Sequence, residues 1–192
     1  IRQTNVCNMK CLSCGPVYSS LWGAEEYKLN HGLKYSNKEP YNKKLLKSGV
    51  LCVDNDQFED YILNNINDVE QIYFAGGEPM LNPLHWKILE KLDQLQRYNT
   101  QIFYNTNLLK LSYKGKHIFD YWDKFTNWTA GCSIDAVGPR ADYVRTGTKW
   151  STIDKHIKQL QIKYPQLCHI DTTVSALSVG GLKELITYCK SA

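Results

Sequence analysis

The sequence predicts an α/β fold: a partial, open TIM-type (β/α) barrel with a parallel sheet inside and helices outside. Strand-like and helix-like segments alternate along the chain in about five βα units, and such alternation is typical of parallel sheets. The chain has 192 residues, which is too short for a complete barrel of ~250 residues. Residues of unusual chemistry follow the predicted strands, where parallel βα folds bind their ligands.

The individual elements follow from short apolar runs and from apolar residues at helical spacing. Gly76-Gly77 ends the second strand, Pro83 opens the helix after it, and Pro165 stops a later helix. The predicted strands are 1–6, 71–75, 101–105, 129–134 and 168–175. The predicted helices are 15–28, 57–66, 83–95, 115–124, 150–164 and 181–190. Residues 30–56 are polar and are predicted to form a surface insertion.

The composition is that of a globular protein, with 43% hydrophobic and 22% charged residues. These values exclude a wholly disordered chain, a coiled coil and a collagen-like fibre. No apolar run approaches the ~18–20 residues that a membrane-spanning helix needs. The net charge of +4 is too small to indicate a nucleic-acid partner.

The ends of the chain and its cysteines indicate a piece of a longer cytoplasmic protein. The sequence begins at Ile1 and stops just after a helix-like segment, so we expect residues 1–192 to be a truncated core domain. Its seven cysteines are odd in number, and only three of them are clustered. A secreted disulfide framework would be shorter and denser in cysteine.

The clustered cysteines are Cys7, Cys11 and Cys14, which form a C-x3-C-x2-C motif directly after the first predicted strand. One compact loop can supply three sulfurs to three corners of a [4Fe–4S] cluster, which leaves one iron open to an outside ligand. The alternative is a zinc site completed by a distant histidine. Ligand softness favours the iron–sulfur cluster.

Other polar residues follow the remaining strands. Gly76-Gly77-Glu78-Pro79 follows the second strand, where glycines let the backbone approach a ligand and Glu78 offers a carboxylate to a cation. Asn105 lies at the end of the third strand. Ser133 and Asp135 share one face at the end of the fourth, with Arg145 downstream as a carboxylate clamp. The alternatives are ordinary turns, a helix cap at Asp135 and a surface arginine.

Taken together, these motifs resemble the radical S-adenosylmethionine (radical SAM) superfamily. The match covers roughly residues 1–180 and is most similar to the branch that carries an auxiliary-cluster (SPASM or twitch) region after the barrel. The resemblance implies that Cys7, Cys11 and Cys14 bind a [4Fe–4S] cluster whose open iron chelates S-adenosylmethionine (SAM). The cofactor-binding residues that it implies are Gly76, Gly77, Glu78, Pro79, Asn105, Ser133, Asp135, Arg145, Val174 and Leu177.

The same resemblance implies a reaction. The reduced cluster cleaves SAM to methionine and a 5′-deoxyadenosyl radical, which takes a hydrogen atom from a substrate that the sequence does not identify. A peptide or protein substrate is favoured by family analogy alone, and the implied reductant is a flavodoxin or a ferredoxin. A non-catalytic module that binds zinc or an electron-transfer cluster is the alternative function. It would need neither the GGEP motif nor the pair formed by Ser133 and Arg145.

The chain departs from the family pattern at three points. Leu12 stands where an aromatic residue is usual, and Leu108 stands where a glycine usually follows the Thr-Asn pair, here Thr106-Asn107 at the end of the third strand. The auxiliary-cluster cysteines that the branch carries downstream are absent from the sequence. The remaining cysteines are predicted to be core or surface thiols, and they are Cys52, Cys132, Cys168 and Cys189.

Overall fold

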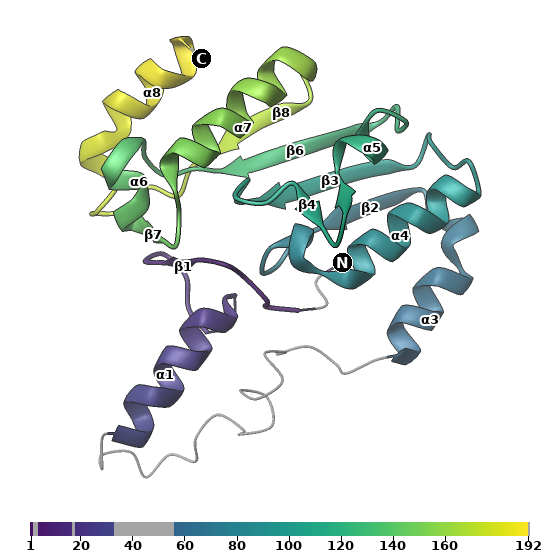
Figure 1. Ribbon diagram of the computed structural model, residues 1–192, viewed down its shortest axis with the longest axis horizontal. Helices are drawn as coiled ribbons and strands as arrows, with labels where there is room; N and C mark the ends of the chain where they lie inside the picture. The colour runs from purple at the N-terminus through teal and green to yellow at the C-terminus, as the bar shows by residue number, and fades with distance from the viewer. Residues whose placement is uncertain (2–3, 17, 33–55, 192) are drawn as a thin grey trace.

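The computed structural model describes residues 1, 4–16, 18–32 and 56–191 (Figure 1). Its centre is a parallel sheet of four strands in the order β2-β3-β6-β8. The strands are β2 (Gln71–Phe74), β3 (Gln101–Thr106), β6 (Trp128–Ser133) and β8 (Cys168–Asp171). The structure therefore confirms the predicted α/β class, with a parallel sheet and flanking helices.

Helices follow the strands in the alternating order that the sequence predicts. The helices are α1 (Ser20–Gly32), α3 (Asp56–Asn64), α4 (Pro83–Gln94), α5 (Phe119–Trp122), α6 (Gly138–Val144), α7 (Trp150–Lys163) and α8 (Leu182–Ser191). Short 3-10 turns are η1 (Ile66–Asp68), η2 (Pro79–Leu81) and η3 (Val179–Gly181). In Figure 1, α3 and α4 lie at the β2 end of the sheet, and α7 and α8 lie at the β8 end.

The core lies between one face of the sheet and the helices. Along β2, Ile72 and Phe74 are buried while Gln71 and Tyr73 are exposed, so the strand has one packed face and one open face. The packed face is rich in aromatic rings. Trp122 stacks on Trp128 at 4.1 Å between ring centroids. Burial of these large rings supplies much of the hydrophobic stabilisation.

The first predicted strand is the main correction to the sequence-based elements. Among the described residues of 1–6, none is assigned to a strand. Ile1 nevertheless lies beside the end of β2. Its amino group donates to the Tyr73 carbonyl, and the Ile1 carbonyl accepts from the Ala75 N–H at 3.2 Å. The sheet therefore has four strands where five were expected.

Several boundaries also differ from the prediction. The last strand ends at Asp171 rather than at 175, and the segment 115–124 is partly a hairpin of β4 (Ser112–Tyr113) and β5 (Lys116–His117). Lys114 and Gly115 form its turn, and the positive φ of both residues favours the hairpin over a helix. Most of the predicted insertion 30–56, including Cys52, lies outside the described residues. At its edges, α1 continues to Gly32 and α3 begins at Asp56.

A small second sheet connects the cysteine motif to the far half of the chain. Strand β1 (Lys10–Cys11) pairs antiparallel with β7 (Arg145–Thr146), so Cys11 lies directly opposite Arg145. This pairing brings together residues separated by more than a hundred positions in the sequence. Among the described residues, no helix is both long and apolar enough to cross a membrane.

Candidate functional site

A cavity of about 320 Å³ lies at the carboxyl ends of the parallel strands. It is bordered by the cysteine loop and by the residues that follow β2, β3, β6 and β8. The lining residues are Cys7, Met9, Cys11, Ser13, Cys14, Tyr18, Ser19, Gly76, Gly77, Asn105, Thr106, Asn107, Ser133, Arg145 and Thr173. Ligands of parallel βα folds bind at this edge of the sheet.

All three motif cysteines line this cavity, but their environments differ. Cys11 is buried, Cys7 is half-buried and Cys14 is exposed. The thiols of Cys11 and Cys14 are close enough for each to shift the pKa of the other. The Cys7 sulfur lies 3.8 Å from the side-chain amide of Asn107. The loop thus presents three thiols to one space.

The electrostatic environment favours a thiolate at one end of the loop. The interaction with Cys11, followed by the charge of Arg145, lowers the pKa of Cys14. Burial raises the pKa of Cys7 to about 11, and the interaction with Cys14 raises the pKa of Cys11. Cysteine binds metals as the thiolate, so Arg145 favours metal binding by the loop because its charge lowers the pKa of Cys14.

The donor set fits an iron–sulfur cluster better than it fits a single ion. Among the described residues, no three His, Cys, Asp or Glu side chains are gathered closely enough to hold one metal ion. Each cysteine of a [4Fe–4S] cluster binds a separate iron, so the requirement is a shared cavity rather than a shared point. Cys7, Cys11 and Cys14 meet that requirement, because all three line one cavity.

The structure explains why glycine is required at Gly77 after β2, and the sequence did not indicate this explanation. Gly77 has a φ of +56°, and a β-carbon there would lie 2.3 Å from the Val6 carbonyl oxygen. The Glu78 N–H donates to the same oxygen at 2.8 Å. The close approach that Gly77 permits is therefore to the segment before Cys7, and it fixes the cysteine loop against the end of β2.

Glu78 is bound within the fold and does not line the cavity. Its carboxylate accepts hydrogen bonds from the Thr106 hydroxyl at 2.8 Å and from the Asn107 N–H at 2.7 Å. The side chain is 1% exposed. Glu78 therefore joins the turn after β2 to the turn after β3, and Pro79, also buried, continues into η2. The expected role of Glu78 at a cation has no support in this geometry.

Burial raises the pKa of Glu78 to about 7 from an ordinary value of 4.5. The folded state therefore binds more protons than the unfolded state between these two values, and stability should fall as pH rises through this range. We expect a loss of roughly 3 kcal/mol between pH 4.5 and 7. Urea unfolding of wild type and Glu78→Gln across this range measures the effect.

The Glu78→Gln variant should lose most of this pH dependence, because glutamine does not titrate. The exposed Glu184 in α8 supplies the matched control, and Glu184→Gln should keep the wild-type pH profile. Equal pH profiles for wild type and Glu78→Gln would show that Glu78 does not titrate in this range.

Asp135 and Arg145 form a buried ion pair. Arg145 donates to the Asp135 carboxylate through Nε at 2.8 Å and through Nη2 at 2.9 Å. The Thr173 N–H donates to the same carboxylate at 2.8 Å. Asp135 is therefore neither a helix cap nor open to the cavity, and its partner is the arginine that was expected to clamp a ligand carboxylate. The third nitrogen of Arg145 lies 3.7 Å from the Cys11 sulfur.

The structure gathers part of the predicted residue set. Gly76, Gly77, Asn105, Ser133 and Arg145 line the cavity together with the three cysteines. The residues outside its lining are Glu78, Pro79, Asp135, Val174 and Leu177. The last two are exposed, because the chain leaves β8 earlier than expected and presents Thr173 instead.

Sequence reasoning did not single out several residues of the lining. Asn107 is the clearest case, because its amide contacts both Asn8 and Cys7 and its N–H binds Glu78. The Asn-Thr-Asn turn that ends β3 contained this signal. Met9, Ser19 and Thr173 offered no comparable signal, since their positions depend on how distant segments meet.

The chain is an α/β fold with a four-stranded parallel sheet and flanking helices, and it resembles part of a longer protein of known structure. One solved structure that it resembles is that of Streptococcus suis SuiB bound to S-adenosylmethionine. The two share 16% sequence identity with a TM-score of 0.57, and the match covers 98% of this chain and 35% of that one. This likeness shows the fold. No protein-family model matches the sequence, and no curated protein matches it.

Proposed function

We propose that this chain is the core of a radical SAM enzyme, with a [4Fe–4S] cluster held by Cys7, Cys11 and Cys14. The observation that carries the proposal is the convergence of these three thiols on one cavity with Gly76, Gly77 and Ser133. That cavity lies at the carboxyl edge of a parallel sheet, where βα folds bind ligands. The structural likeness to a SAM-bound protein supports the same proposal.

The cluster, when bound and reduced, supplies the electron that cleaves SAM into methionine and a 5′-deoxyadenosyl radical, which takes hydrogen from a substrate. The chain's own residues bind the cluster and SAM, orient them, and exclude water. In this proposal the backbone at Gly76 and Gly77 binds the SAM ammonium, and the Ser133 hydroxyl binds its carboxylate. Arg145 contributes its charge at Cys11 while it remains paired with Asp135.

The match to SuiB covers 35% of the length of that protein. The substrate of the whole protein is therefore also a proposal. We propose that residues 1–192 form the core domain and that a region beyond it helps to shape the substrate pocket. A peptide or protein substrate and a flavodoxin or ferredoxin reductant complete the proposal.

Anaerobic reconstitution tests this proposal. The chain is loaded with iron and sulfide, reduced with dithionite and supplied with SAM, and 5′-deoxyadenosine is measured. We expect a brown protein that forms 5′-deoxyadenosine. Cys11→Ala should abolish both the colour and the product, because a cluster site loses one of its three thiolates.

The matched control is Cys189→Ala, which removes an exposed thiol of α8 outside the cavity. It should leave iron content and product formation at wild-type levels. A fully loaded cluster that yields no 5′-deoxyadenosine would contradict the enzymatic proposal. Zinc binding with no iron uptake would favour the structural metal module instead.

A further inference from the structure

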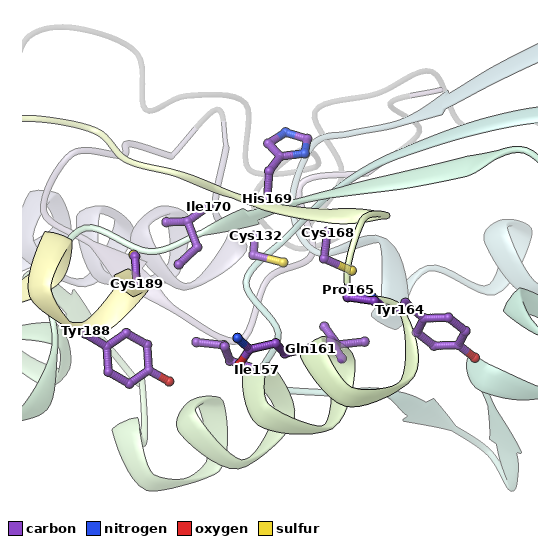
Figure 2. Close-up of a pocket in the computed structure, with 11 residues that line it drawn as sticks. Cys132, Ile157, Gln161, Tyr164, Pro165, Cys168, His169, Ile170, Tyr188 and Cys189 are labelled. Carbon is purple, nitrogen blue, oxygen red and sulfur yellow. The ribbon is translucent and has the colours of Figure 1, made fainter. Parts of the chain in front are cut away.

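A second cavity, of about 260 Å³, lies between the sheet and the helices that cover it, away from the candidate site (Figure 2). It is enclosed by β6, β8, α7 and α8. Three of its lining residues are cysteines, namely Cys132, Cys168 and Cys189. Cys132 directly precedes Ser133, and because side chains alternate along β6, the two point to opposite faces. The cavity therefore contains thiols that the proposed function does not use.

Two of these thiols are neighbours on adjacent strands. Cys132 on β6 is paired in register with Ile170 on β8, and Cys168 lies two residues earlier on the same face of β8. The Cys132 and Cys168 thiols are close enough for each to shift the pKa of the other. Figure 2 shows both side chains directed into the space above α7. The fold thus places two thiols beside each other on one face of the sheet.

The two thiols have different surroundings. Cys132 is 3% exposed, and its sulfur lies 3.7 Å from the Ala130 carbonyl oxygen. Cys168 is half-buried and borders the cavity, so a small reagent can reach it. The interaction with Cys132 lowers the pKa of Cys168, and the same interaction raises the pKa of Cys132. Cys168 is therefore the better nucleophile, and Cys132 is its protonated neighbour.

We propose that Cys168 and Cys132 form a reversible oxidation site for hydrogen peroxide, with Cys168 as the attacking thiol and Cys132 as the resolving thiol. This site is independent of the proposed SAM chemistry, since it shares no lining residue with the other cavity.

The chemistry balances in two steps. The Cys168 thiolate attacks one peroxide oxygen, an S–O bond forms, and the O–O bond breaks. Hydroxide departs, and Cys168 becomes a sulfenic acid. The Cys132 sulfur then attacks the Cys168 sulfur, the S–O bond breaks, and water leaves with the Cys132 proton. The two thiols lose two electrons in total and the peroxide gains them. A dithiol reductant restores both thiols by exchange through a mixed disulfide.

Cys189 provides an internal comparison in the same cavity. Its side chain is exposed, whereas that of Cys168 is half-buried, so exposure alone would make Cys189 the more reactive thiol. Burial of part of the Cys189 thiol raises its pKa, in contrast to Cys168. The proposal therefore predicts a reactivity order opposite to that of exposure.

The test treats the folded, metal-free chain with hydrogen peroxide, blocks remaining thiols with N-ethylmaleimide and maps the products after trypsin digestion. Cys132, Cys168 and Cys189 fall on separate tryptic peptides, which are 125–140, 164–183 and 184–190. We expect peptides 125–140 and 164–183 to be joined by a disulfide that dithiothreitol removes. Cys189→Ser should give the same yield of this product.

Two variants isolate the roles of the pair. In Cys132→Ser, peroxide should leave a sulfenic acid on Cys168 that dimedone traps, because no resolving thiol remains. In the untreated protein at pH 7, iodoacetamide should label Cys168 about tenfold faster than Cys189. Cys132→Ala should remove most of this preference, and so should concentrated guanidinium.

Three results would overturn the proposal. The first is a Cys168 that N-ethylmaleimide still labels fully after peroxide has oxidised other thiols of the chain. The second is a dominant disulfide between Cys168 and Cys189. The third is faster labelling of Cys189 than of Cys168 in the folded protein. Loss of SAM cleavage in the separate experiment would leave all three measurements unaffected.

Discussion

Replacing Arg145 with alanine should destabilise the fold by about 3–5 kcal/mol, because the substitution leaves the Asp135 carboxylate buried without its cation. The side chains of Asp135 and Arg145 are 1% and 12% exposed. Two guanidinium hydrogen bonds of 2.8 and 2.9 Å are lost together with the charge. Urea unfolding of wild type and Arg145→Ala measures the difference in the free energy of unfolding.

A double variant distinguishes an unpaired charge from lost packing. Asp135→Asn combined with Arg145→Ala should be more stable than Arg145→Ala alone, since the orphaned charge is gone. Lys158→Ala removes one partner of the exposed pair formed with Asp154 and should cost less than about 1 kcal/mol. Equal costs for Arg145→Ala and Lys158→Ala would contradict the role assigned to the buried pair.

Gly77→Ala should destabilise the fold by about 2–5 kcal/mol, from two separate costs. A left-handed backbone costs a residue with a β-carbon about 1–2 kcal/mol, and overpacking adds typically 1–3 kcal/mol. The φ of Gly77 is +56°, and the new β-carbon would lie 2.3 Å from the Val6 carbonyl oxygen. The segment before Cys7 must shift to relieve this clash, so cluster loading in the reconstitution assay should also fall.

Gly115→Ala is the matched control for the backbone cost. Gly115 has a φ of +84° in the turn between β4 and β5, and a β-carbon there would meet nothing within 4 Å. Its substitution should therefore cost only about 1–2 kcal/mol. Urea unfolding of both variants gives the steric part as a difference. Equal costs for the two would mean that the approach to Val6 carries no constraint.

Much of the fold could be predicted from local patterns. Local patterns predicted the parallel sheet and its helices. These patterns are the alternation of segments, the glycines after β2, and the prolines at helix boundaries, Pro83 and Pro165. The segment before Cys7 was wrongly predicted as a complete strand, because it is apolar at its ends; among its described residues, only Ile1 bonds to the end of β2. Short apolar runs do not reveal whether a segment pairs along its whole length.

The candidate site was also predicted only in part from local patterns. The cysteine motif, the diglycine, Asn105 and Ser133 were predicted to share a strand edge, and they line one cavity. Glu78 and Asp135 were predicted from the same local patterns, yet each is satisfied within the fold by partners from other segments. A carboxylate in a sequence carries no sign of whether a ligand or a neighbouring segment will bind it.

The sequence by itself determined the parallel α/β architecture and the three clustered thiols, because both depend on residues that are close together in the chain. Only the tertiary structure decided that Arg145 neutralises Asp135 beside Cys11, and that Cys132 meets Cys168 across two strands. These contacts join residues far apart in sequence. Their geometry depends on strand register, which is set by the packing of the whole sheet rather than by any local pattern.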